Sequence, residues 1–397
     1  MQMCSEKKYI QTETNRLSER VEQIPEALSI EINQLVYDLK RKGRDIITLS
    51  LGEAFFDIPV FDFGSIDFNK GYHYSDSQGI PELRNKIAKY YREHYQAEVD
   101  AKKEVLITAG SKIAIYMAML ATVNQRDEVL IHEPAWLSYQ EQVKLIGATA
   151  HFIPYFADVG DFHQYISPKT RMLILNNPNN PSGRIYKREE LEAIYKLCVQ
   201  NNIYLLIDEA YSDFILDGSF FSGGRLDSEK NNVIVVNSLS KNMGMSGWRV
   251  GYLISNEKVI KAVLKLNQHL ITCAPTVLLY YMEKYFDLII SHTLPQVHDI
   301  VLKKQSVKKI LKNYKILHLE GGATFYFFLS IENYSGNSTD FAMELLKNHD
   351  ISVVPGSAYG ASTERFIRFS IGTESLERIE HAIKIISIML KKQIIEN

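Results

Sequence analysis

The chain has 397 residues, more than the roughly 250–300 residues at which one hydrophobic core usually stops growing, so we expect two domains. Hydrophobic residues make up 46% of the sequence and charged residues 23%, a composition typical of soluble globular proteins that excludes disordered and fibrous classes. The formal net charge of −2, without a long block of like charges, favours small-molecule chemistry over binding to nucleic acid or to a membrane.

The cysteines Cys4, Cys198 and Cys273 are scattered and form no C-x-x-C pair, and their odd count indicates a reducing compartment rather than a disulfide framework. The N-terminal residues MQMCSEKKYIQTETNRLSERVE lack the apolar core of a signal peptide. The longest apolar run, around IAIYMAMLATV, is too short to span a membrane. We therefore expect a cytoplasmic protein without a membrane anchor.

Short apolar, β-branched runs alternate with helix-period segments through the middle of the chain. EVLITAG precedes SKIAIYMAMLATV, DEVLIHEP precedes AWLSYQEQVKLIG, and RMLILNNP precedes KREELEAIYKLCVQNN, and the runs IYLLIDEAY, NNVIVVNSLS and WRVGYLIS follow. This alternation predicts an α/β fold of βαβ units, in which helices cover both faces of a mainly parallel central sheet. Ligands of such sheets bind beyond the carboxyl ends of the strands.

After Asn256 the pattern changes to longer helical stretches and separate strands, which predicts a smaller α+β domain. We assign residues 50–295 to a large cofactor-binding domain, and residues 1–49 together with 296–397 to the small domain. The elements expected after Asn256 are helices over 257–270, about 276–313 and 339–348, strands in ATFYFFLSI, ISVVPG and RFIRFSIG, and a last helix from Glu374.

Three polar residues follow two neighbouring apolar strands. Asp208 ends the strand in LLIDEAYSDF, Tyr211 follows it, and Lys241 comes after the next strand. Neighbouring parallel strands would bring all three to one crevice. A carboxylate at a strand end costs free energy unless it meets a cation or strong donors. A helix N-cap or a structural ion pair would explain a lone Asp208 equally well, so the interpretation depends on the group.

The segment NSLSKNMGMSGWRVGY surrounds Lys241 with hydroxyls and an arginine. Partial desolvation and the positive charge of Arg249 would lower the pKa of Lys241, as a nucleophilic amine requires, although a salt bridge is the usual role of a lysine. Ser238, Ser240 and Arg249 supply donors that suit a phosphate. The Gly110–Lys112 turn in ITAGSKIAIY places backbone N–H groups at a helix start and forms a second, less specific anion cradle.

These segments together resemble a known family. In their order and spacing, ITAGSK, EPAWLSY, NNPNNPSG, IDEAY and SLSKNMGMSGWRVGY are similar to the class I/II aminotransferases of the fold-type I pyridoxal 5′-phosphate enzymes. The resemblance extends from about LSLGEAFFDIP to FIRFSIG and covers nearly the whole chain. It implies a pyridoxal 5′-phosphate-dependent aminotransferase of amino-acid metabolism that moves the amino group of an L-amino acid to a 2-oxo acid in two steps, without a metal ion.

The resemblance also implies roles for individual residues. Lys241 would hold the cofactor as a Schiff base and later shuttle the proton, and Asp208 would pair with the protonated pyridine nitrogen. Tyr211 and Asn180 would donate to the phenolic oxygen of the cofactor and so lower the pKa of the Schiff base. The residues implied to contact the cofactor are Tyr74, Gly110, Ser111, Lys112, Trp136, Asn180, Asp208, Tyr211, Ser238, Ser240, Lys241 and Arg249.

The residues implied to hold the substrate are Gly52, Trp136, Asn180 and Arg368. The family spacing selects Arg368, not Arg365, for the α-carboxylate. Tyr74 matches a tyrosine that reaches the phosphate of the neighbouring subunit, which implies a homodimer with shared active sites. Lys112 matches a lysine that meets the distal carboxylate in an aspartate-accepting subgroup, but a phosphate contact is equally compatible. The chain has GEAFFDIP where many relatives have GEPDFDTP, so preference for an ordinary dicarboxylate does not follow.

Two other functions stay open at this point. A lyase of the same fold, similar to the aminocyclopropane-carboxylate synthases, shares a very similar SLSK…RVG segment, but those enzymes carry tyrosine at the position of Trp136. A regulator that only senses the cofactor would need a nucleic-acid-binding module. This neutral chain has neither spare residues nor a basic N-terminal region for one.

Overall fold

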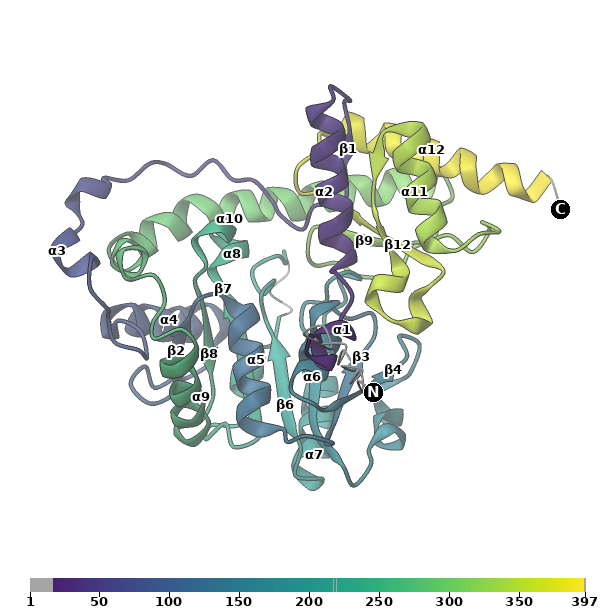
Figure 1. Ribbon diagram of the computed structural model, residues 1–397. Helices are drawn as coiled ribbons and strands as arrows, with labels where there is room; N and C mark the ends of the chain where they lie inside the picture. The colour runs from purple at the N-terminus through teal and green to yellow at the C-terminus, as the bar shows by residue number, and fades with distance from the viewer. Residues whose placement is uncertain (1–16, 217, 219, 396–397) are drawn as a thin grey trace, which may run out of the picture.

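The computed structural model describes residues 17–216, 218 and 220–395 of the chain. Cys4 and most of the N-terminal segment in which we expect no signal peptide lie outside these residues. Within the described part, no helix is long and apolar enough to cross a membrane. Figure 1 shows a larger unit and a smaller unit side by side, with the long helix α10 (Thr276–Asn313) running through both.

The larger unit is built on one central sheet. Its strands are β2 (Val105–Thr108), β3 (Glu128–His132), β4 (Thr149–Ile153), β5 (Thr170–Asn176), β6 (Tyr204–Asp208), β7 (Val233–Ser238) and β8 (Gly251–Ile254). They lie in the order β2-β8-β7-β6-β5-β3-β4. Only β8 runs opposite to the other six strands, so the predicted α/β fold with a mainly parallel sheet is confirmed.

Helices cover both faces of this sheet. They are α4 (Pro81–Tyr95), α5 (Ser111–Thr122), α6 (Ser138–Leu145), α7 (Arg188–Gln200) and α9 (Glu257–Leu270). The short α8 (Leu239–Asn242) follows the end of β7, and the short α3 (Phe68–Gly71) packs against α10. Successive residues of a strand point to opposite faces. In β6, Leu206 accordingly packs with the buried residues of α5 and α9, whereas Leu205 and Ile207 pack with those of α7. This two-sided burial explains why the strands are continuous apolar runs.

The smaller unit combines elements that follow α10 with elements from the N-terminal part of the chain. Its elements are α2 (Leu28–Arg41), β1 (Ile47–Thr48), β9 (Tyr326–Ser330), α11 (Ser338–His349), β10 (Ile351–Ser352), β11 (Val354–Pro355), β12 (Phe366–Ser370) and α12 (Leu376–Ile395). The short α1 (Glu19–Glu22) lies against α6 of the larger unit. The first half of α10 packs in the larger unit through Leu279 and Phe286, and the second half packs in the smaller unit through Val301 and Leu311. The expected boundary after residue 295 thus falls inside this helix, and the domain limits stay a prediction.

Candidate active site

A cavity of about 650 Å³ lies where the two units meet, beyond the carboxyl ends of β5, β6 and β7. The parallel pairing of β6 with β7 places Lys241, in α8 directly after β7, beside Asp208 at the end of β6. The smaller unit closes the other side with Ser29 of α2, Tyr326 of β9 and Arg368 of β12. The strand-end crevice predicted from the sequence is therefore the place where these side chains converge.

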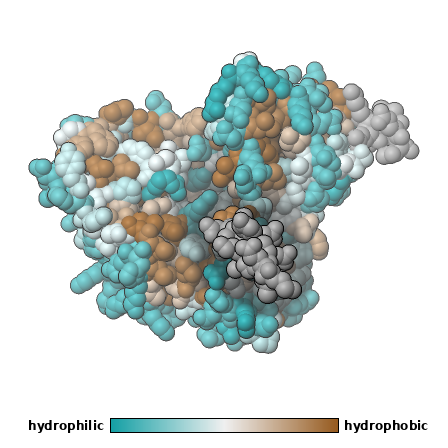
Figure 2. All heavy atoms as spheres, in the orientation of Figure 1, coloured by the Kyte–Doolittle hydropathy of each residue, from teal (hydrophilic) through white to brown (hydrophobic). Residues whose placement is uncertain are grey.

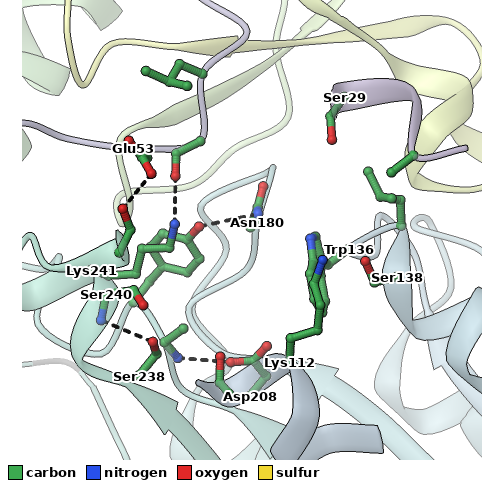
Figure 3. A pocket seen from close by; sticks show the side chains of 18 of the residues that line it. Ser29, Glu53, Lys112, Trp136, Ser138, Asn180, Asp208, Ser238, Ser240 and Lys241 are labelled. Carbon is green, nitrogen blue, oxygen red and sulfur yellow. Dashed lines mark hydrogen bonds between the residues drawn. The ribbon is translucent and has the colours of Figure 1, made fainter. Parts of the chain in front are cut away.

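Lys241 points into this cavity (Figure 3). Its Nζ donates to the backbone oxygen of Gly52 at 2.6 Å. Burial lowers the pKa of Lys241 to about 8, and Glu53 opposes this shift while Arg368 adds to it. At pH 8, Lys241 is therefore a free, nucleophilic amine in about half of the molecules, whereas an ordinary lysine is almost wholly protonated at this pH.

Asp208 is buried at the floor of the cavity. Its Oδ2 accepts from the hydroxyl of Tyr139 at 2.6 Å, and its Oδ1 accepts from the backbone N–H of Ala210 at 3.1 Å. Burial raises the pKa of Asp208, and the hydrogen bond from Tyr139 opposes this. A protonated ring nitrogen in the cavity would place an opposite charge beside this desolvated carboxyl group and so stabilise its ionised form.

Asn180 and Tyr211 line the cavity together with Lys241, whose Nζ lies 5.6 Å from the centre of the Tyr211 ring. The Nδ2 of Asn180 donates to the Tyr211 hydroxyl at 3.4 Å, and its backbone N–H donates to Asn176 Oδ1 at 2.6 Å. Within the described residues, the Oδ1 of Asn180 is buried without a hydrogen-bond partner. A buried acceptor without a donor costs free energy. Asn180 and Tyr211 therefore suit a bound polar molecule that can supply a hydrogen bond to this oxygen.

The other end of the floor has the donors of an anion site. Gly110, with a φ of 94°, precedes α5, whose first N–H groups have no partner within the helix. A Cβ on Gly110 would lie 2.4 Å from Nη2 of Arg249. The guanidinium can therefore occupy this position only because residue 110 has no side chain. Ser111, Ser238 and Ser240 line the same cavity, and the backbone N–H of Ser240 donates to Ser238 Oγ at 3.1 Å. These groups fit a phosphate.

Lys112 and Trp136 lie side by side on the opposite wall (Figure 3). The Nζ of Lys112 lies 5.0 Å from the centre of the Trp136 ring. Burial and the charge of Arg249 lower the pKa of Lys112. The phosphate contact and the contact with a distal carboxylate therefore involve different atoms of Lys112. Its backbone N–H lies at the start of α5 and suits a phosphate, whereas its ammonium lies over the tryptophan ring and suits a carboxylate.

Arg368 is only 4% exposed, yet its guanidinium has donors to spare. Its Nη2 donates to the backbone oxygen of Ser50 at 2.6 Å, and its Nε has no hydrogen-bond partner among the described residues. The ring centres of Tyr326 and Tyr359 lie 4.7 and 5.4 Å from its Cζ. Arg365 instead donates to backbone oxygens and does not line the cavity. Arg368 is thus the arginine that can receive a carboxylate here.

The structure gathers most of the predicted site residues around one cavity. They are Gly52, Ser111, Lys112, Trp136, Asn180, Asp208, Tyr211, Ser238, Ser240, Lys241, Arg249 and Arg368. Gly110 adjoins the cavity, whereas Tyr74 lies outside it on the surface. Sequence reasoning missed Tyr139 and Tyr326, which hydrogen-bond to Asp208 and Tyr211, and Glu53, whose charge opposes the lowering of the Lys241 pKa. A lysine amine, a buried carboxyl group and an anion cradle together fit the pyridoxal 5′-phosphate that the resemblance implies.

Comparison with known proteins identifies the same family that the sequence motifs resemble. A sequence model of the family described as aminotransferase class I and II matches residues 59–386. The chain is 32% identical to the aspartate aminotransferase of Thermotoga maritima, over 92% of this chain and 97% of that protein. It is 31% identical to aromatic-amino-acid aminotransferase 2 of Thermococcus litoralis, over 95% and 99%. The crystal structure of aspartate aminotransferase from Thermotoga maritima matches with a TM-score of 0.84 at 30% identity, covering 94% of this chain and all of that one.

Proposed function

The chain belongs to the family of class I and II aminotransferases, whose cofactor is pyridoxal 5′-phosphate, and we propose that Lys241, Asp208 and Arg368 carry its reaction. An L-amino acid gives up its amino group in a first half-reaction, and a 2-oxo acid takes that group in a second. The observation that carries this proposal is the convergence of a lysine of lowered pKa, a buried carboxyl group and a buried guanidinium on one cavity.

The floor of the cavity would hold the cofactor. Lys241 would bond its aldehyde carbon, Asp208 would meet its ring nitrogen, and Arg249 with the start of α5 would bind its phosphate. When it is bound there, pyridoxal 5′-phosphate supplies an electron sink that stabilises negative charge developing on the substrate Cα. Asp208 keeps this sink effective, because a desolvated carboxylate favours the protonated ring nitrogen.

Lys241 would also move the reacting proton. Because its pKa is lowered to about 8, roughly a tenth of the Lys241 amines are unprotonated at pH 7, far more than for an ordinary lysine. This form can accept the proton from the substrate Cα and then give it up again. The backbone oxygen of Gly52, 2.6 Å from Nζ, orients the amine without adding a charge. Orientation matters because proton transfer requires the reacting atoms to lie within hydrogen-bond reach.

Arg368 would fix the position of the substrate. Its contacts with the Tyr326 and Tyr359 rings and with the backbone oxygen of Ser50 immobilise the guanidinium. Its remaining N–H groups can form a two-pronged hydrogen bond with the α-carboxylate. The substrate Cα is then held in one orientation relative to Lys241, which raises the rate of the chemical step.

We propose acidic and aromatic L-amino acids as donors. The names of the relatives above specify aspartate for one and aromatic amino acids for the other. In this cavity the Lys112 ammonium can bind a distal carboxylate, whereas Trp136 and Ile30 offer apolar surface to a ring. The cavity therefore accommodates both kinds of side chain.

We further propose a homodimer with shared active sites. Tyr74 is 83% exposed and does not line the cavity of its own chain, so its expected phosphate contact requires a second chain. Val60 and Tyr72 are 96% and 76% exposed in the same stretch of sequence. Figure 2 shows hydrophobic residues at this end of the molecule, around α3 and α10. Exposed apolar surface of this kind is typical of protein interfaces.

A single-turnover experiment tests the proposed function. Cofactor-loaded protein is mixed with L-aspartate, L-glutamate or L-phenylalanine, without any oxo acid. We expect at least one donor to give its 2-oxo acid in an amount equal to the active sites, and further product only after 2-oxoglutarate is added. Continuous turnover of an amino acid without an acceptor would indicate a lyase instead, and no oxo acid from any donor would contradict the proposal.

A further inference from the structure

We propose that Tyr326 is a positioning residue that links the substrate-carboxylate site at Arg368 to the cofactor-oxygen site at Tyr211. The inference rests on the proposed function, which gives those two sites their meaning. From the aromatic run ATFYFFLSI alone, the tyrosine would be interpreted as a strand residue that packs in the core. In the structure it lines the cavity, and its hydroxyl and its ring contact different parts of the site.

Tyr326 reaches both neighbours from one position. It begins β9, which pairs with β12, the strand that carries Arg368. Its hydroxyl oxygen lies 3.0 Å from that of Tyr211, and its ring centre lies 4.7 Å from the Cζ of Arg368, within cation–π range. All three side chains are buried, so water screens neither contact. One side chain therefore connects the two sites directly.

The backbone of Tyr326 is held from α10. The buried Lys304 donates its Nζ to two backbone oxygens, one of them that of Tyr326. A Cβ on Gly183 would lie 2.6 Å from the same Nζ, so the loop that carries Asn180 packs closely against this lysine. Tyr326 is thus fixed at the junction between that loop and the strand of Arg368.

The hydrogen bond between the two hydroxyls acquires a direction when the cofactor is bound. Tyr211 has one hydroxyl proton, and in the proposed site it donates that proton to the ring oxygen of the cofactor. Tyr326 is then the donor in the pair, and the oxygen of Tyr211 accepts. Donation into this oxygen polarises the Tyr211 O–H group, so Tyr211 donates more strongly in turn.

Charged groups around Tyr326 set the strength of this donation. Burial raises the pKa of Tyr326, the cation of Arg368 opposes that rise, and Glu53 adds to it. Lys304, whose pKa burial lowers to about 7, donates to the backbone oxygen of the same residue. A substrate carboxylate that pairs with Arg368 would offset the cation, so Tyr326 would donate less strongly. Occupancy of the carboxylate site is thereby transmitted to Tyr211.

Packing alone does not require the Tyr326 hydroxyl. The adjacent buried residues in the chain are the phenylalanines Phe325, Phe327 and Phe328. Tyr326→Phe keeps the ring against Arg368 and removes only the oxygen. Tyr359 provides a matched control, because its ring lies 5.4 Å from the same Cζ and its hydroxyl interacts with Arg368, whereas no hydrogen bond joins it to Tyr211 within the described chain.

The test is a spectroscopic pH titration of the bound cofactor. Donation from Tyr211 to the cofactor oxygen lowers the pKa of the bound cofactor. Tyr326→Phe should therefore raise this pKa, which means that the acid dissociation constant of the cofactor falls about three- to tenfold, as expected for one hydrogen bond. Tyr359→Phe should change it less than about twofold. In a Tyr211→Phe background, Tyr326→Phe should also add less than about twofold, because the linking partner is already gone.

Three results would overturn the proposal, each obtained on variants whose thermal unfolding midpoint shows an intact fold. They are an unchanged titration in Tyr326→Phe, an equal effect of that substitution with and without Tyr211, and an equally large effect of Tyr359→Phe. Failure of the proposed function would look different. In that case the wild-type protein itself would show no cofactor absorbance that depends on Lys241.

Discussion

Gly110 and Arg249 lie so close that a Cβ on Gly110 would come within 2.4 Å of Nη2 of Arg249. Gly110 also has a φ of 94°, which other residues rarely adopt, so two constraints meet at one position. The guanidinium occupies the space that a side chain would fill, beside the first N–H groups of α5. The proposed phosphate site therefore depends on the glycine as much as on the arginine.

Gly110→Ala should weaken binding of pyridoxal 5′-phosphate at least about tenfold, or ~1.4 kcal/mol, because the displaced arginine no longer meets the phosphate. Fluorescence titration of the cofactor-free protein measures this. Gly43→Ala is the matched control, since Gly43 also has a positive φ, of 84°, but an added Cβ there meets no atom within 4 Å. An equal loss of affinity in both variants would assign the effect to backbone strain instead.

The lowered pKa of Lys241 predicts the pH dependence of cofactor attachment. Only the free amine can bond the aldehyde, so the attachment rate in cofactor-free protein should rise about tenfold per pH unit below pH 8 and level off above it. Stopped-flow absorbance follows the reaction, with a small primary amine as reference. A rate that keeps rising to pH 10, as for an ordinary lysine, would show that the cavity does not perturb Lys241.

Arg368→Lys should lower kcat/KM for every amino donor by at least about tenfold. The substitution keeps the charge but loses the planar fork, and each hydrogen bond to a carboxylate contributes roughly 1.5–3 kcal/mol. Steady-state kinetics with several donors measure the loss. Arg365→Lys serves as control, because Arg365 donates to backbone oxygens away from the cavity. A larger loss in that variant would move the carboxylate site.

Mixed dimers test whether Tyr74 serves the opposite subunit. If it does, a dimer of one Lys241→Ala chain and one Tyr74→Ala chain contains one site with both defects and one with neither. Subunit exchange should then raise the activity above the average of the two parent proteins. Activity equal to that average after confirmed exchange would show that Tyr74 acts within its own chain.

The positions of Asp208 and Lys241 could be predicted because both follow apolar strands, and parallel strands end at one edge of a sheet. Tyr139 and Tyr326 could not be. Their hydroxyls contact Asp208 and Tyr211 across separations of 69 and 115 residues, and these contacts depend on tertiary packing that no local pattern records. A tyrosine in an apolar run is therefore interpreted as a core residue unless the hydrogen-bond partner of its hydroxyl is known.

The fold shows the same limit. The predicted helix over 257–270 agrees with α9 because Asn256 caps it, accepting from the backbone N–H of Val259 at 2.9 Å. Strand β4 was not predicted, because Thr149 and His151 are exposed at the sheet edge and break the apolar pattern. The last helix begins at Leu376 rather than at Glu374.

The covalent role of Lys241 is tested most directly by borohydride reduction of the cofactor-loaded protein, followed by peptide mass spectrometry. We expect a phosphopyridoxyl label on the peptide that contains Lys241, and its loss in Lys241→Ala together with amino transfer. Label on a different lysine of the wild-type protein, or normal turnover by Lys241→Ala, would contradict the proposed active site.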